Sequence, residues 1–265
     1  MKHKLLNLVL FALFTSFVVA CSSASSTEEP AADSQGASMA QDEPKVLVFS
    51  KTNGFRHESI EPGIEAIQKL GQENNFSVDT SEDSTVFTQD NLSDYAAVVF
   101  LNTTGDILNE EQQSAMEQYI QNGGGYVGIH SAADTEYEWP WYGKLVGAYF
   151  DGHPGNPNVR EATLHVVDAN HPSTKPLPKD WVHSDEWYNY KDINTEQNKD
   201  LIMLDETTYE GGTNGDYHPI SWYKDFDGGR AFYTGSGHTD ESFTDSMFLQ
   251  HLMGGLNYAM GNSDL

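Results

Sequence analysis

Five histidines adjoin expected strand ends or turns, although the sequence separates them widely. They are His57, His130, His153, His218 and His238. Two carboxylates, Asp185 and Glu186, stand directly before Trp187. An imidazole titrates near neutral pH, so this set of side chains could supply a general base, and histidine with carboxylate could also bind a divalent metal ion. The sequence has no H-E-x-x-H or comparable fixed spacing, so a metal ion is an option and not a requirement.

The segment from Gly125 to Ser131 has the pattern of a strand that enters a sharp turn. In nucleophile-elbow enzymes, such a turn exposes a serine or a cysteine at the strand end. Here His130 stands at the elbow with Ser131 next, and no glycine closes the G-x-S-x-G pattern, so a serine hydrolase is not favoured. The elbow would hold the His130 side chain toward a ligand, and we expect His130 to be the general base.

Strands and helices alternate over the first part of the chain and would position these residues. Apolar runs predict strands at 45–49, 76–80, 96–101 and 126–130, and apolar residues at helical spacing predict helices at 60–70 and 110–121. This alternation predicts a parallel α/β sheet with helices on both faces. Ligands bind beyond the carboxyl ends of such strands, which directs attention to the loops 51–57, 102–106 and 130–134.

After Asp134 the composition changes. All five tryptophans lie between Trp139 and Trp222, and short strand-like runs occur at 162–167, 201–204, 220–223 and 230–234. An amphipathic helix is expected over 245–260. We expect the second half to extend the sheet and to form an aromatic, histidine-rich wall over it.

The amino terminus predicts export. Residues 1–20 combine a positive start, an apolar run and small residues, as in a signal peptide, and Cys21 follows at the lipobox position of bacterial lipoproteins. Residues 21–44 are rich in Ser, Ala and acid and predict a disordered tether. The globular domain is then 45–265. We expect lipidation of Cys21 and a location in the cell envelope, either periplasmic or on the outer membrane.

Charge and cysteine usage exclude several classes of function. The chain carries 14 Lys and Arg against 40 Asp and Glu, a net charge of −26. Such a surface repels phosphates, so nucleic acid is not an expected partner. The one cysteine is Cys21, so a lipidated chain has no thiol for a disulfide, a metal ligand or a nucleophile.

Several segments together resemble the ThuA-like (trehalose utilisation) family over 45–261. They are Phe55-Arg-His57, Gly123-Gly-Gly-Tyr-Val-Gly-Ile-His130, Gly147-Ala-Tyr-Phe-Asp-Gly-His-Pro154, Asp185-Glu-Trp-Tyr188, His218-Pro-Ile-Ser-Trp222 and Gly229-Arg-Ala-Phe-Tyr-Thr-Gly-Ser-Gly-His238. The resemblance implies a flavodoxin-like fold of the class I glutamine amidotransferase type. The amidotransferases carry a cysteine at the elbow, and His130 stands there instead, which excludes glutamine hydrolysis through a thioester.

The resemblance also implies carbohydrate use through 3-keto-glycosides. A 3-keto group acidifies the neighbouring C2–H, so a neutral imidazole could remove that proton and lead to cleavage or isomerisation. The expected catalytic residues are His130, His57, Asp185 and Glu186. The expected sugar contacts are Arg56, Trp187, Tyr188, His218 and Trp222. The expected ligands of a divalent metal ion are His153, His238 and Glu186. The alternative is a non-catalytic sugar-binding lipoprotein, and the substrate and oligomeric state stay open.

Overall fold

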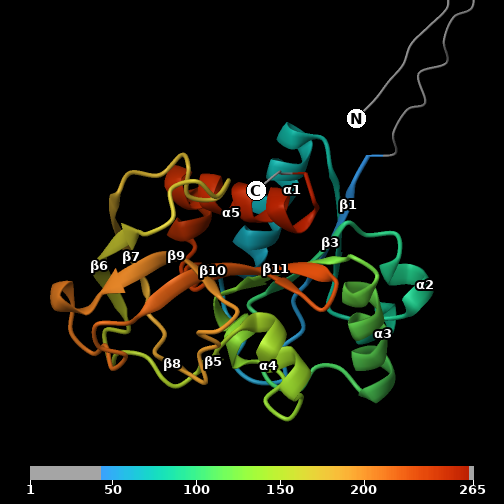
Figure 1. The fold of residues 1–265 in the computed structure, drawn as a ribbon, viewed down its shortest axis with the longest axis horizontal. Coiled ribbons are helices and arrows are strands. Elements are labelled where there is room, and N and C mark those ends of the chain that lie inside the picture. Colours follow the sequence, from blue (N-terminus) through green and yellow to red (C-terminus); the bar gives the residue numbers. More distant parts are fainter. Residues whose placement is uncertain (1–42, 263–265) are drawn as a thin grey trace, which may run out of the picture. The chain divides into compact units, whose positions relative to one another are not determined.

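The computed structural model describes residues 43–262 and contains a nine-stranded sheet in the order β2-β1-β3-β4-β11-β10-β9-β6-β7 (Figure 1). Five neighbouring strands are parallel: β2 (Ser77–Ser81), β1 (Lys45–Phe49), β3 (Ala97–Leu101), β4 (Gly125–Ile129) and β11 (Gly229–Thr234). This order is that of a flavodoxin-like sheet. The predicted α/β fold is therefore confirmed, and the predicted signal peptide, Cys21 and tether lie outside the described residues.

Four further strands extend the sheet beyond β11, each antiparallel to its neighbour. They are β10 (Pro219–Phe226), β9 (Lys199–Asp205), β6 (Val159–Val166) and β7 (Asp180–Glu186). Four successive reversals make β7 run in the same direction as β11. A separate two-stranded ribbon pairs β5 (Tyr149–Phe150) with β8 (Tyr190–Lys191).

Helices cover both faces of the sheet. In Figure 1, α1 (Ile60–Asn74) and α5 (Ser246–Ala259) lie on one face, and α3 (Glu110–Gln121) and α4 (Pro140–Val146) lie on the other. The short helix α2 (Gln89–Leu92) contacts α3. Four 3₁₀ segments complete the elements: Ser84–Val86, His130–Asp134, Glu206–Thr208 and Glu241–Thr244.

Local sequence explains where the best-defined elements begin and end. The strands β3 and β4, and β1 after Lys45, are apolar because helices bury both of their faces. Asn109 and Gln112 form a capping box that starts α3, whose bounds match the predicted helix. The helix α5 starts at Asp245, whose carboxylate accepts hydrogen bonds from the backbone N–H groups of Met247 and Phe248.

The strand β7 was not predicted, because its sequence, Asp-Trp-Val-His-Ser-Asp-Glu, contains no run of apolar residues. Its buried positions alternate as a strand requires, but they are occupied by Trp181, His183 and Asp185. The inward face thus carries two polar groups in place of Val or Ile. This strand delivers both carboxylates of the predicted site.

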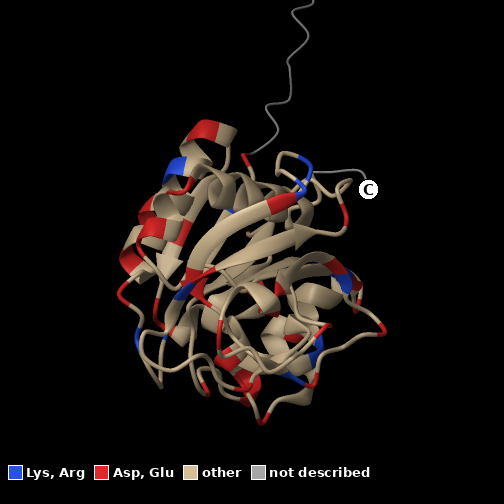
Figure 2. Cartoon of the chain, turned by 90° about the vertical axis from the view of Figure 1, so that its left-hand side faces the viewer, with Lys and Arg blue, Asp and Glu red and all other residues tan. Residues whose placement is uncertain are grey.

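The acidic composition appears on the surface. Figure 2 shows Asp and Glu spread over helices and loops, with few Lys and Arg among them. Among residues 43–262, no helix is long and apolar enough to cross a membrane.

Candidate functional site

Four of the predicted site residues meet at the carboxyl edge of the sheet. His57 follows β1, His130 follows β4, His238 follows β11 and Glu186 ends β7, so each lies at or beyond the carboxyl end of a strand that runs in the same direction. One potential ligand atom of each side chain lies within 4.8 Å of those of the other three. We call these four residues the His₃Glu cluster.

The elbow holds His130 in a strained backbone conformation. Its φ is 47°, in the left-handed region that costs a non-glycine residue on the order of 1 kcal/mol. The Tyr233 hydroxyl donates to the His130 carbonyl at 2.8 Å, and the His130 Nδ1 lies 2.9 Å from the carbonyl oxygen of Gly235. Because a carbonyl only accepts, Nδ1 carries the proton and Nε2 is turned toward the cluster.

Glu186 supplies the negative charge of the cluster. Its Oε2 lies 3.4 Å from His130 Nε2 and 3.1 Å from His238 Nδ1, and its Oε1 accepts a 2.6 Å hydrogen bond from the amide of Asn158. Burial favours the neutral acid, but these three neighbours outweigh it and hold the pKa of Glu186 well below its usual range. Glu186 is therefore an ionised carboxylate at neutral pH.

Asp185 points the other way from Glu186 and holds the loop that carries His238. Its Oδ1 accepts from the backbone N–H groups of Glu186 and His238 at 2.8 and 3.0 Å. Its Oδ2 accepts from Gly237 N–H at 2.7 Å and from the Ser242 hydroxyl at 2.8 Å. The strand β7 is four places from β11 in the sheet, so these bonds show that the β6–β7 hairpin curls back over the loop. Asp185 is a positioning residue and does not belong to the His₃Glu cluster itself.

The electrostatics of His57 and His238 differ. Burial lowers the pKa of His57, and the neighbouring His130 and His238 lower it further, to about 2. Burial also disfavours the charged form of His238, but the Glu186 carboxylate outweighs it and raises the pKa of His238. His57 is therefore neutral at physiological pH.

His153, a predicted metal ligand, lies at the open side of the cluster. Its Nδ1 is 3.5 Å from Glu186 Oε1 but only 2.8 Å from the Pro154 carbonyl oxygen, and its side chain is 39% exposed. The proton on Nδ1 is fixed by that carbonyl, which leaves Nε2 as the free acceptor. The predicted metal ligands were His153, His238 and Glu186. In the structure, His57 and His130 are the histidines that lie with Glu186 and His238 in the cluster.

Aromatic side chains surround the cluster. The Phe55 ring is 66% exposed and lies edge-on to His57, with centroids 4.9 Å apart. The predicted sugar contact Tyr188 is buried, with its ring centroid 4.1 Å from that of His130 and 4.3 Å from that of Phe150. Phe55 and Asn158 were not predicted, since neither a lone exposed Phe nor an Asn near a proline differs from an ordinary loop residue.

The other predicted sugar contacts do not meet the cluster. His218 bonds through its two ring nitrogens to Glu206 at 2.7 Å and to the Tyr188 carbonyl at 2.8 Å.

Trp187 and Trp222 are buried, and their indole N–H groups donate to the carbonyls of Arg160 and Val146. The second half is aromatic-rich as predicted, and these two tryptophans belong to its buried core. Arg56 is exposed and forms ion pairs with Glu61 and Glu82.

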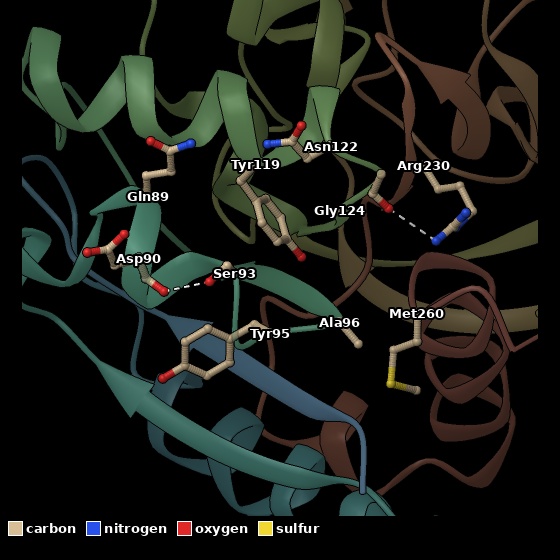
Figure 3. A pocket seen from close by; sticks show the side chains of 11 residues that line it. Gln89, Asp90, Ser93, Tyr95, Ala96, Tyr119, Asn122, Gly124, Arg230 and Met260 are labelled. Carbon is tan, nitrogen blue, oxygen red and sulfur yellow. Dashed lines mark hydrogen bonds between the residues drawn. The ribbon is translucent and has the colours of Figure 1, made fainter. Parts of the chain in front are cut away.

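A cavity of about 540 Å³ lies at the opposite edge of the sheet, near the amino ends of β3, β4 and β11 (Figure 3). Tyr95, Tyr119 and Arg230 line it, and the Arg230 guanidinium is held by the carbonyls of Gly123 and Ala259. Its lining offers no histidine, so we place the chemistry at the His₃Glu cluster and not in this cavity.

The parallel half-sheet and its sharp elbow define a class I glutamine amidotransferase-like fold in which histidine replaces the nucleophilic cysteine. A family model described as ThuA, trehalose utilisation, matches residues 45–259, and the chain belongs to this family. The family is linked to carbohydrate use, and this member is not a glutamine amidotransferase. No curated protein matches the sequence significantly.

Solved structures agree with this assignment. A ThuA-like protein from Bacteroides uniformis has a TM-score of 0.72 and 25% identity, covering 83% of this chain and 93% of that one. A ThuA-like protein from Parabacteroides merdae has a TM-score of 0.66 and 21% identity, covering 83% and 91%. A β-galactosidase from Bacillus circulans sp. alkalophilus shares only the fold, with a TM-score of 0.53 and 15% identity over 83% of this chain and 32% of that one.

Proposed function

We propose that this chain is an exported lipoprotein enzyme of the cell envelope that processes keto-sugars or their glycosides. The observation that carries the proposal is the convergence of three histidines and an ionised glutamate at one sheet edge in a trehalose-utilisation fold. Purely structural histidines would each satisfy their ring nitrogens separately, as His218 does. The four residues of the cluster instead face one another.

The proposed reaction begins with loss of a proton next to a carbonyl. A base takes the C2 proton of a 3-keto-sugar, and the electron pair of that C–H bond forms an enolate. In cleavage the carbonyl re-forms as the C1–O bond breaks, and the leaving oxygen takes up a proton. In isomerisation, the proton returns to the other face of C2. Neither route requires an oxidant or a reductant.

We place the base at His153 and not at the predicted His130. The His130 side chain is fully buried and its Nε2 faces Glu186, whereas His153 is 39% exposed and keeps Nε2 free. A carbonyl that binds at the cluster would bring its neighbouring C–H toward His153. Phe55, the exposed ring beside His57, would stack on the sugar.

The test is turnover of a panel of 3-keto-disaccharides by the purified protein. Replacing a general base typically lowers the rate by about 10²–10⁴-fold, and we expect this of His153→Ala. A loss is also expected for His130→Ala, with the fold retained. His165→Ala is the matched control, because His165 is an exposed histidine that pairs with Asp180 and Asp205.

The alternative is a sugar-binding lipoprotein without catalysis, which the exposed Phe55 ring would also serve. It predicts that calorimetry detects binding of the same sugars while no product forms. In that case Phe55→Ala would weaken binding, and His153→Ala would leave it unchanged.

A further inference from the structure

His130 and Glu186 present two acceptors to each other. The Nδ1 proton of His130 is committed to the Gly235 carbonyl, so its Nε2 has only a lone pair, and this atom lies 3.4 Å from Oε2 of Glu186. Within residues 43–262, His130 Nε2 has no hydrogen-bond partner. Two facing lone pairs in a buried site are unfavourable unless a positive group lies between them.

His238 faces the same oxygen of Glu186. Its Nδ1 is buried 3.1 Å from Glu186 Oε2, yet no group of the described chain makes a hydrogen bond to it. Two imidazole nitrogens are thus directed at one carboxylate oxygen without a hydrogen bond to it.

The distances fit a metal centre. Ligands about 2.0–2.2 Å from a tetrahedral ion lie about 3.4 Å from each other. The two nitrogen–oxygen distances of 3.4 and 3.1 Å agree with this value, and His57 brings a third imidazole within 4.8 Å.

We propose that the His₃Glu cluster binds one divalent transition-metal ion. The ligands are His130 Nε2, His238 Nδ1, Glu186 Oε2 and one ring nitrogen of His57. Imidazole with carboxylate suits zinc, manganese, iron, cobalt or nickel. This set replaces the predicted one, since His57 and His130 enter and His153 moves to the edge.

The surroundings have the features of an outer ligand shell. The Gly235 carbonyl fixes the tautomer of His130, and the Asn158 amide orients Glu186 through its second oxygen. Asp185 fixes the backbone of His238. The ion would act as a Lewis acid toward a substrate oxygen. The proposed metal site can be tested independently of the proposed keto-sugar reaction, because metal binding is measured without a sugar.

The test is metal analysis of the full chain, purified in detergent and free of a histidine tag. We expect about one equivalent of a transition metal per chain, its removal by a chelator, and its replacement by cobalt(II) with the visible bands of nitrogen and oxygen ligands. His238→Ala and Glu186→Gln should lose the metal, whereas His165→Ala should retain it.

A milder variant keeps the test valid if those proteins do not fold. Asn158→Ala removes only an outer contact and should weaken metal affinity by about 10–100-fold. Protein without metal that also takes up no zinc, manganese, cobalt or nickel would overturn the proposal. Equal metal content in wild type and in a folded Glu186→Gln variant would overturn it as well. A metal-loaded protein that turns over no keto-sugar would contradict the proposed function alone.

Discussion

Asp185 connects the strand that carries Glu186 to the loop that carries His238. Its two oxygens accept four hydrogen bonds, three of them from backbone N–H groups. Burial favours the neutral acid, but the neighbouring imidazoles of His183 and His130 and these donors outweigh it and lower the pKa of Asp185. The geometry of the His₃Glu cluster therefore depends on a carboxylate that touches none of its ligand atoms.

Asp185→Asn should destabilise the fold and loosen the site. An amide replaces one acceptor oxygen with a donor, which leaves a buried N–H group unpaired at about 1–3 kcal/mol. We expect urea unfolding to show a loss of this size, with weaker metal binding. Asp180→Asn is the control, because Asp180 is an exposed carboxylate at the start of the same strand. Equal stability of Asp185→Asn and wild type would contradict the positioning role.

At the level of single residues, the sequence predicted three histidines and the glutamate correctly as neighbours, because each follows a strand end. It did not predict which histidines lie inside the cluster and which lie at its edge. Whether His153 or His57 lies inside the cluster depends on how the β6–β7 hairpin curls, and this is a tertiary property. His218 precedes the antiparallel strand β10 and so lies at the same edge of the sheet, but both of its ring nitrogens bond outside the cluster, to Glu206 and to the Tyr188 carbonyl.

At the level of elements, α5 owes its close approach to the sheet to glycine. A Cβ on Gly255 would lie 2.3 Å from the Phe232 ring. In an exposed helix, Gly→Ala stabilises by about 1 kcal/mol, but here we expect Gly255→Ala to destabilise by about 1–3 kcal/mol through overpacking. Thermal unfolding would detect this reversal, and Gln250→Ala on the exposed face should change little. A higher melting temperature for Gly255→Ala would show that α5 can move away.

The helix α5 also buries His251 between Ser173 and Ser221. Burial lowers the pKa of His251 from 6.5 to about 3. The unfolded chain takes up this proton below about pH 6.5 and the folded protein does not, so stability falls as the pH drops toward 3. Between pH 7 and pH 4 the wild type should lose about 3 kcal/mol more than His251→Gln. Urea titrations of both proteins at the two pH values would measure this difference, and equal losses would contradict it.

Elements with regular patterns were predictable, and β7 was not. The helix α3 has a capping box and the strands β1 and β3 are apolar, so their local sequence specifies them. The strand β7 has His183 and Asp185 at its buried positions, and only contacts from α5 and the 235–238 loop make their burial favourable.

At the level of the whole molecule, the parallel half-sheet was predicted, as was an extension of the sheet by the second half. The strand order of that extension was not, because β9 pairs with β6 and β10 and does not pair with β7, the strand of the same sheet that precedes it along the chain. The acidic surface has no counterpart in the cluster, which contains a single carboxylate among imidazoles.

Export is tested on the intact chain in cells. Cys21→Ser should prevent lipidation and leave the protein unprocessed or soluble on cell fractionation. Wild type should appear in the membrane fraction with the added mass of acyl chains. A Cys21→Ser protein that stays in the membrane fraction at the mature mass would contradict the lipoprotein assignment.

The central claim is that the His₃Glu cluster with His153 removes a proton next to a sugar carbonyl. The most direct measurement is exchange of the C2 hydrogen of a 3-keto-disaccharide for deuterium in heavy water, followed by NMR. Wild type and His165→Ala should exchange this hydrogen, and His153→Ala should be slower by about 10²–10⁴-fold. A wild-type protein that binds the sugar but leaves its C2 hydrogen in place would contradict the claim and support a sugar-binding lipoprotein instead.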